Sequence, residues 1–382
     1  MTFAIKPFTE DLIPAVKELN RRLTAGGAPP EFRFPEHPTP EWLPRIGDRR
    51  IYQQYFVLME NGVVRGGYSF KQQNFSFYGQ IRSVGLWHWP ISEGMVNKAY
   101  APVALQMLRY ALREHPLMYG LGMGAYAAGP LPKILAALGW SMYLVPFRFK
   151  VKRPRRFLRE IRVLRNNVMQ KVLMDLAALT GAGALALRIL QGAGTPRAPL
   201  GVQAERITGF GSWADVLWEA CKERYAMVAV RDRETLDVLY PATSRRFLCY
   251  KVTRGGTVLG WAVLLDTPMH NHKYYGNLRV GSIVDCLALP ENASAVIRAA
   301  TRLLEERGVD LVVSNQSHAA WSVALRNAGF MAGASNVLFA ASKELTGLLH
   351  PLDVTVSRTH FNRGDGDASM DISNPAKLGQ VT

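Results

Sequence analysis

The chain has 382 residues, of which 48% are hydrophobic, and a formal net charge of +16. This hydrophobic fraction excludes wholesale disorder, and the length suffices for two domains that each bury a core. The first residues lack the basic start and apolar stretch of a signal peptide, and no apolar run reaches membrane-spanning length. The three cysteines, Cys221, Cys249 and Cys286, have no metal-binding spacing and predict packed thiols in a reducing compartment. We therefore expect a cytoplasmic protein without a metal site.

The first 151 residues predict a mixed α/β unit. Apolar runs and alternation predict strands, and apolar residues at helical spacing predict helices. Asn61-Gly62 between two strands is typical of a hairpin, and the proline- and aromatic-rich segment 28–44 predicts a loop or lid. Strands are expected at 3–8, 52–59, 63–71, 80–89, 117–123 and 142–151, and helices at 11–23, 102–115 and 130–138.

Residues 152–201 read as a basic linker. Half of the excess charge lies between Arg148 and Arg165, where nine Lys or Arg residues are opposed only by Glu160. A helix expected over 155–173 carries apolar residues on one face and arginines on the others, and the segment 176–190 is apolar.

Two interpretations of this linker stay open. The one we favour is a helix packed between the units with a solvated basic face. The alternative is a basic amphipathic segment, 152–190, that makes peripheral contact with an anionic membrane at its inner face. Nucleic-acid binding is not favoured, because only the charge would support it.

Residues 202–345 repeat the element order of the first unit. A strand that ends at Leu289-Pro290 matches the strand that ends at Pro90, and Gly329-Phe330 after a helix matches Gly139-Trp140. Strands are expected at 205–210, 247–253, 258–265, 281–289, 309–315 and 336–342, and helices at 213–224, 233–239, 293–307 and 317–327.

The order of elements over 281–342 resembles the second half of the GNAT acyltransferases, the acetyl-CoA-dependent N-acetyltransferase superfamily. The resemblance rests on the strand ending at Leu289-Pro290, the helix behind it, the strand to Asn315, and the helix closed by Gly329-Phe330. With the repeat, it implies an α/β (α+β) fold of two tandem GNAT-like mixed-sheet domains, 1–151 and 202–345, followed by a tail, 346–382. The alternative is two unrelated α/β layers with a similar element order.

The resemblance implies acetyl-CoA or a longer acyl-CoA as co-substrate. Its pyrophosphate would sit at the start of the helix after the fourth strand, where free amides and the helix dipole attract an anion. Neither unit carries the family's usual Arg/Gln-x-x-Gly-x-Gly/Ala loop. In the second unit Glu291 would repel a pyrophosphate, although it would also stabilise the helix start. The first unit therefore offers the better cradle, formed by Gly94, Asn97, Lys98, Ala99, Tyr100 and Ala101.

Acyl transfer also needs a base near the attacking group. Asp285 is a lone carboxylate in an apolar strand and is the leading candidate for the base, the alternative being a structural aspartate bonded to nearby backbone. His88 and Glu93 are the titratable candidates of the first unit, although a surface histidine is the commoner explanation of His88. The leaving-group acid is unassigned: Leu135 and Leu325 fill the family's tyrosine positions, and Tyr126 and Ser317 lie in the preceding loops without following the pattern.

These features predict an acyltransferase that moves an acyl group from acyl-CoA to an amine or hydroxyl. A small molecule or sugar is the expected acceptor, in surface-polysaccharide biosynthesis. The alternatives are a non-catalytic tandem binding or scaffold protein at the membrane surface and a FemAB-type aminoacyl transferase. In the tail, Asp365 and Asp367 alternate with glycine but lack the other ligands of a calcium loop, so we expect an acidic tail or a segment lying over a cleft.

Overall fold

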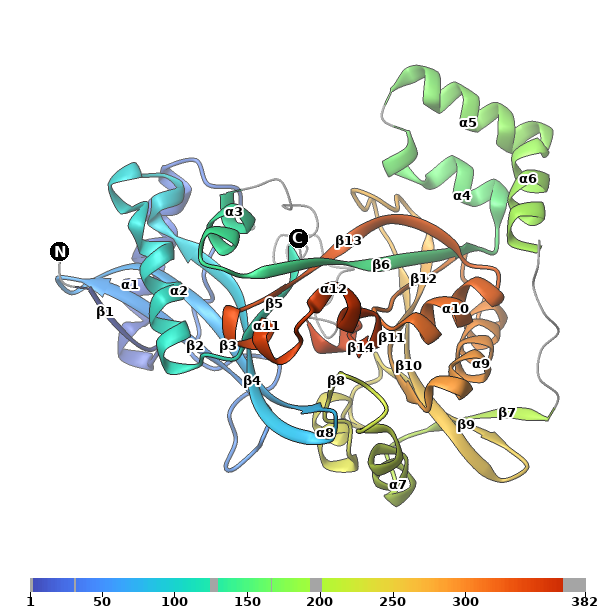
Figure 1. Cartoon of the computed structure of the whole chain (residues 1–382). Helices are drawn as coiled ribbons and strands as arrows, with labels where there is room; N and C mark the ends of the chain where they lie inside the picture. Colours follow the sequence, from blue (N-terminus) through green and yellow to red (C-terminus); the bar gives the residue numbers. More distant parts are fainter. Residues whose placement is uncertain (1–2, 31, 124–129, 166, 193–200, 367–382) are drawn as a thin grey trace. The chain divides into compact units, whose positions relative to one another are not determined.

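The computed structural model describes residues 3–30, 32–123, 130–165, 167–192 and 201–366. The chain divides into two compact units. Unit 1 comprises the described residues of 1–144 and 336–355, and unit 2 comprises those of 145–335 and 356–366. Each unit combines parallel and antiparallel strands with packed helices (Figure 1), so the predicted α/β class is confirmed.

In unit 1 the strands follow the order β1-β2-β3-β4-β5-β13. β4 and β5 are parallel, and the other neighbours are antiparallel. The bounds are β1 Phe3–Pro7, β2 Tyr52–Glu60, β3 Val63–Phe77, β4 Gln80–Ser92, β5 Met118–Met123 and β13 Met331–Ala341, of which the part from Asn336 belongs here. The helices are α1 Ile13–Ala25, α2 Pro102–Glu114, α3 Pro130–Ala137, α11 Lys343–Leu348 and α12 Leu352–Thr355.

Helices α1 and α2 cover opposite faces of these strands. Successive residues of a strand point to opposite faces, so neighbouring β2 residues contact different helices. The buried α1 residues Val16, Leu19 and Leu23 pack with Val57 of β2. On the other face, α2 packs with Leu58, and with Tyr68 and Phe70 of β3. The hairpin predicted at Asn61-Gly62 is present, with φ of 48° and 80° at these two residues, as a tight turn between twisted strands requires.

In unit 2 the strands follow the order β6-β12-β11-β10-β9-β7, with β11 and β12 parallel. Their bounds are β6 Ser141–Val151, of which the part from Val145 belongs here, β7 Val202–Ile207, β9 Leu248–Arg254, β10 Thr257–Pro268, β11 Arg279–Ala288 and β12 Leu311–Asn315. β8 (Met227–Ala229) and β14 (Thr359–His360) lie off this path and pair in parallel with each other. The helices are α4 Pro154–Glu160, α5 Val168–Thr180, α6 Ala182–Gly192, α7 Ser212–Cys221, α8 Arg233–Leu239, α9 Ala293–Glu306 and α10 Ala319–Asn327.

The last strand of each repeat pairs in the other unit. The sequence places 142–151 at the end of the first repeat, but Phe147–Val151 pair with β12 in unit 2. Reciprocally, Val337–Ala341 of β13 pair with β5 in unit 1. Each unit is therefore completed by a strand that follows the other repeat in the sequence.

In each unit the inner parallel pair is short, and the inner strand carries a bulge close by. β4 and β5 pair only at Gly85 with Met118 and at Leu86 with Tyr119. Two β4 residues, Trp89 and Pro90, then face the single β3 residue Tyr68, and Trp89 has a φ of 55°. An extra residue bends a strand, and a positive φ is strained for a tryptophan. The bend accompanies the parting of β4 from β5.

The same arrangement recurs in unit 2. The parallel pairing of β11 with β12 ends at Ile283 and Ser314, and Val284 is the extra residue opposite β10. Both units thus contain two parallel strands that part at or close to a bulge.

The single helix predicted over 155–173 is wrong. α4 ends at Glu160, a 3-10 turn spans Arg162–Leu164, and α5 begins at Val168. Asn167 caps α5 because its Oδ1 accepts from the Gln170 N–H over 2.8 Å. The apolar spacing continues across the break, so periodicity alone did not reveal it.

The three cysteines are free and buried, as predicted. Burial raises the pKa of the Cys221 and Cys249 thiols to about 12. No single described helix is long and apolar enough to cross a membrane, and α5 and α6, bent by 82°, pass the length and composition test only as a pair.

Candidate functional site

The candidate site lies in unit 1, where β4 ends and α2 begins. Residues 93–101 form the β4–α2 loop, which contains two 3-10 turns, Glu93–Met95 and Lys98–Tyr100. Each turn starts at a capping side chain. Ser92 Oγ accepts from the Gly94 N–H over 3.1 Å, and Asn97 Oδ1 accepts from the Ala99 N–H over 3.0 Å.

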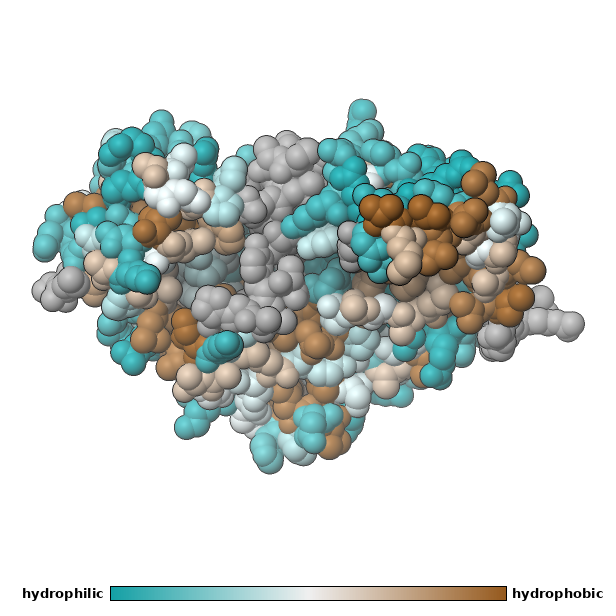
Figure 2. All heavy atoms as spheres, turned by 90° about the horizontal axis from the view of Figure 1, so that it is seen from above, coloured by the Kyte–Doolittle hydropathy of each residue, from teal (hydrophilic) through white to brown (hydrophobic). Residues whose placement is uncertain are grey.

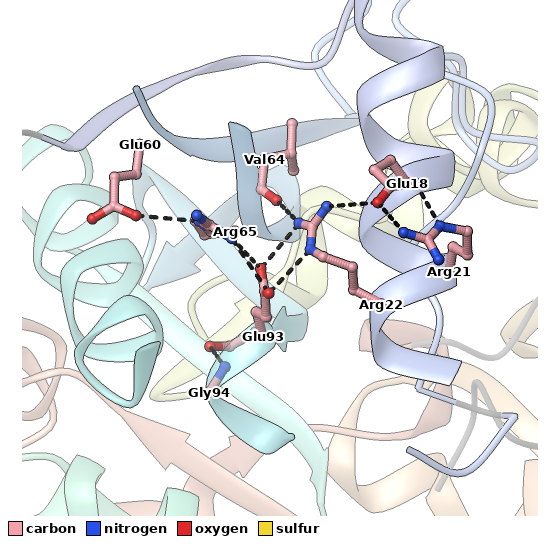
Figure 3. Close-up of polar contacts among 9 residues, drawn as sticks. Glu18, Arg21, Arg22, Glu60, Val64, Arg65, Glu93 and Gly94 are labelled. Carbon is pink, nitrogen blue, oxygen red and sulfur yellow. Dashed lines mark hydrogen bonds and ion pairs between the residues drawn. The ribbon is translucent and has the colours of Figure 1, made fainter. Parts of the chain in front are cut away.

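Glu93 ties this loop to α1 and β3 (Figure 3). Its carboxylate accepts from Arg22 Nε and Nη2, both over 3.0 Å, and from Arg65 Nη1 over 3.1 Å. Arg22 also donates to the Val64 carbonyl over 2.6 Å, and Arg65 to Glu60 over 3.2 Å. Glu93 is buried, and these two guanidinium groups supply the partners that a buried carboxylate needs.

Two further contacts fix the far end of the loop. The Arg65 guanidinium lies 4.1 Å from the centre of the Tyr100 ring, a cation–π distance. A Cβ on Gly94 would lie 2.6 Å from the Tyr100 carbonyl oxygen, so the absence of a side chain allows the two turns to meet. Glu93 and Gly94, two of the predicted site residues, therefore shape this loop.

The predicted pyrophosphate cradle is present as a loop, but five of its amides already have partners, including that of Asn97, which donates to the Glu93 carbonyl over 2.9 Å. Gly94 and Ala99 donate to the caps, and Tyr100 and Ala101 donate to the Asn97 and Lys98 carbonyls over 3.0 and 3.1 Å. The exposed Lys98 ammonium and the first turn of α2 are the groups left for an anion. The cradle formed by these residues stays a prediction.

His88 lies on β4, close to the residues that part from β5. It is half-buried, and it pairs in register with Ser69 of β3, so the two side chains share a face. Gln53, Lys71 and Gln73 point to the same face from β2 and β3. We call these five residues the polar band.

The polar band is largely buried, with Gln53, Ser69, Lys71 and Gln73 each at most 5% exposed. Gln53 Nε2 donates to Ser69 Oγ over 2.5 Å, and the Lys71 ammonium lies 5.1 Å from the centre of the Trp42 ring. Both side-chain polar atoms of Gln73 are buried and have no hydrogen-bond partner among the described residues. Buried side-chain amides nearly always have hydrogen-bond partners, so an amide without one suggests a position where a polar molecule binds.

Asp285 belongs to unit 2 and lies at the bulge of β11. Its Oδ2 accepts from Arg231 Nε over 2.8 Å and from the Tyr240 hydroxyl over 2.6 Å. Its Oδ1 accepts from Asn362 Nδ2 over 2.8 Å and from the Cys286 N–H over 2.9 Å. The carboxylate is 1% exposed, and this arrangement is that of a structural aspartate. A role for Asp285 as the base stays a prediction.

The C-terminal segment 359–366 supplies part of this network. Asp365 accepts from Arg231 Nη2 over 2.6 Å, so two buried carboxylates share one guanidinium. These contacts hold the pKa of Arg231 above its usual range despite burial, which opposes the charge. Asp365 thus neutralises an arginine, while Asp367 lies outside the described residues. Among the described residues no group of three His, Cys, Asp or Glu side chains could hold a metal ion.

The same segment lies between the parted strands of unit 2. His360 Nε2 donates to the Cys286 carbonyl of β11 over 2.7 Å, and its ring stacks on Trp321 and Tyr225. After β12, the Ser317 N–H donates to the Phe361 carbonyl over 3.1 Å, and the Phe361 N–H donates to Ser317 Oγ over 2.7 Å. Ser317 is therefore engaged by this segment, and Tyr126 lies outside the described residues.

Sequence reasoning missed most of the partners in both units. Arg22 and Arg65 are 71 and 28 residues from Glu93, and Arg231 is 54 residues from Asp285. The sequence did indicate that such partners exist, because a carboxylate in an apolar strand requires a cation or several hydrogen-bond donors. The polar band gave a misleading signal, since alternating polar residues in a strand usually face water.

Comparisons with known proteins give distant structural likenesses. No protein-family model and no curated protein matches the chain. A probable N-acyltransferase from Enterococcus faecalis V583 is 10% identical and covers 91% of this chain and 75% of its own, with a TM-score of 0.49. A GCN5-related N-acetyltransferase from Anabaena variabilis ATCC 29413 is 10% identical, and the match covers 90% of this chain and 73% of the neighbour, with a TM-score of 0.49. Saccharomyces cerevisiae N-myristoyltransferase with bound myristoyl-CoA is 11% identical, and the match covers 90% of this chain and 79% of the neighbour, with a TM-score of 0.47. At this identity the activity has to be argued from the chain's own residues.

Replacing Glu93 with Gln should destabilise unit 1 by about 2–4 kcal/mol, because two partly buried guanidinium groups lose their shared carboxylate. Urea unfolding followed by tryptophan fluorescence measures this loss. The matched control is Glu18→Gln, which removes the pairs of an exposed carboxylate with Arg21 and Arg22 and should leave the urea midpoint almost unchanged. Equal losses for the two variants would contradict the role of Glu93.

The stability of unit 2 should fall as the pH is lowered from about 6.5 to 4. Burial, and then the neighbouring His360 and Arg358, lower the pKa of His318 to about 4, and burial lowers that of His272 likewise. The unfolded chain binds these protons first, so each histidine removes up to about 1.4 kcal/mol per pH unit within this window. His318→Asn, which keeps a side-chain acceptor for the Ala320 N–H, should make the decline shallower in urea midpoints measured against pH. An unchanged slope would contradict the assignment.

Proposed function

We propose that the chain is an acyl-CoA-dependent acyltransferase whose donor binds in unit 1. The supporting observation is the parting of β4 and β5 beside the bulge at Trp89-Pro90, directly before a loop and a helix start. Parted parallel strands leave main-chain groups without a strand partner, and an extended amide-bearing chain such as pantetheine can use them. Lys98 and the first turn of α2 would then attract the pyrophosphate.

Unit 2 is less suited to the donor. There the segment 359–366 occupies the gap between β11 and β12, with Thr359, His360 and Phe361 each at most 3% exposed. Glu291, next to the start of α9, adds a negative charge. We therefore assign unit 2 a supporting role.

In the proposed reaction the acceptor amine or hydroxyl attacks the thioester carbonyl carbon. The carbon–sulfur bond breaks, CoA leaves as a thiolate that is then protonated, and a base takes the acceptor proton. His88 is the base we propose, because it lies on the bulged strand and shares a face with the polar band. Glu93 is held by two arginines, so we assign it to support of the loop.

The polar band would orient the acceptor. Gln73 offers a donor and an acceptor that are both without a partner among the described residues, a combination that suits hydroxyl groups. A hydroxyl-rich acceptor such as a sugar or amino sugar of a surface polysaccharide fits this chemistry, and it is the acceptor class that we propose.

Calorimetry with acetyl-CoA and myristoyl-CoA tests donor binding. Lys98→Glu should weaken binding at least ~5-fold, because it replaces an attractive charge by a repulsive one. Lys17→Glu, on the exposed side of α1, and Ser294→Glu, in the first turn of α9 in unit 2, should leave binding unchanged. A loss with Ser294→Glu alone would move the donor to unit 2. No binding of either thioester to the parent chain would favour a scaffold or an aminoacyl transferase.

His88→Gln tests the base. We expect kcat/KM for an amino-sugar acceptor to fall about 100-fold while the calorimetric Kd for acyl-CoA stays constant. His37→Gln, at an exposed position of unit 1, is the control. If Asp285→Asn abolishes turnover in a folded protein and His88→Gln does not, the base is Asp285.

A further inference from the structure

The segment from α4 to α6 in unit 2 is a packed helical element, one side of which is exposed as far as the described residues show. Arg165 binds Asp175 through two contacts of 2.8 and 2.9 Å and donates to the Leu158 carbonyl over 2.9 Å, which ties α5 to α4. A Cβ on Gly183 would lie 2.7 Å from Leu158 Cδ1, so α6 packs closely on α4. Gly181, with φ of 76°, ends α5 and allows the turn into α6.

The side of α5 and α6 away from these contacts exposes large apolar side chains. Figure 2 views the molecule from the side on which α5 lies in Figure 1, and it shows hydrophobic atoms gathered over this region with hydrophilic atoms beside them. The spacing follows a helical stripe, so these residues lie together. Between 51% and 76% of each remains exposed for Val168, Met169, Val172, Leu173, Leu176 and Leu179 of α5 and Leu185, Ile189 and Leu190 of α6.

The apolar stripe continues into a strongly basic neighbourhood. Val163 and Leu164, in the turn before α5, are also nearly half exposed. Eight exposed cations lie on the same helical segment: Lys152, Arg153, Arg155, Arg156, Arg159, Arg162, Lys171 and Arg188. The only carboxylates described between 152 and 192 are Glu160 and Asp175. Some of the cations have partners, as Arg153 and Arg156 have in Asp310.

We infer that this side docks on an anionic membrane surface. An apolar stripe that enters the acyl boundary, flanked by cations that meet lipid phosphates, is the charge complementarity of an interfacial helix. A protein partner would more often meet an interface core depleted of charge. α5 and α6 have 13 and 11 residues, and at about 1.5 Å per residue neither crosses a hydrocarbon core of about 30 Å. Together the two helices pass the length and composition test for a span, but they are bent by 82°, so we place the element on the membrane surface.

Vesicle flotation of the full chain tests this inference. Binding to phosphatidylcholine vesicles containing 30% phosphatidylglycerol should be at least ~10-fold stronger than to pure phosphatidylcholine, and it should weaken with salt. Leu173→Glu/Leu176→Glu should reduce binding at least ~10-fold. Val216→Glu, at an apolar residue of α7 that is 72% exposed, is the matched control and should bind as the parent does.

A second variant and its control distinguish the contribution of the basic side chains to vesicle binding from that of the apolar ones. Arg155→Glu/Arg159→Glu should remove the preference for the anionic vesicles, whereas Arg245→Glu, at an exposed site in unit 2, should keep it. All of these positions are exposed, so thermal midpoints should stay within a few degrees of the parent. A parent chain that does not float with the anionic vesicles overturns the inference. So does a concentration-dependent dimer, seen by sedimentation, that Leu173→Glu/Leu176→Glu abolishes while flotation is unchanged.

Discussion

The constraint behind both units is that a buried peptide group needs a hydrogen-bond partner. Two parallel strands that part leave such groups unpaired, and the structure shows one solution within the chain. In unit 2 the segment 359–366 enters the gap, and its His360 and Phe361 bond to β11 and to the residue after β12. In unit 1 the pairing of β4 with β5 stops after two residue pairs. The chain therefore fills one gap with its own segment, whereas under the proposed function the other gap would receive the acyl donor.

Much of the architecture was predictable because local patterns decide it. The apolar runs at 281–289 and 309–315 became β11 and β12, and the turn at Asn61-Gly62 has the predicted geometry. The break between α4 and α5 was not predictable from periodicity, because the apolar spacing runs through it and a cap at Asn167 decides the matter. The exchange of β6 and β13 was also beyond the sequence, since a strand's apolar pattern does not name its neighbour.

The candidate site was likewise predictable only in part. The loop 93–101 was found from its place after a strand and before a proline-initiated helix, but its anchoring by Arg22 and Arg65 depends on tertiary contacts. Asp285 was singled out as a charge in an apolar strand, and the structure surrounds it with Arg231, Tyr240 and Asn362. A lone buried carboxylate signals that something must compensate it, and the sequence alone does not distinguish a structural partner from a substrate.

The exchanged strands have a consequence for how the protein is made. While the ribosome synthesises the chain, β5 has no partner on its outer side until residues 337–341 emerge, about 200 residues after β5 itself. Until then the nascent first half presents an open sheet edge, which is a template for intermolecular association. Neither half can therefore complete its sheet before the other half is present. If the two halves were expressed as separate chains, we expect each to expose an unpaired strand edge and to aggregate unless the other half is supplied.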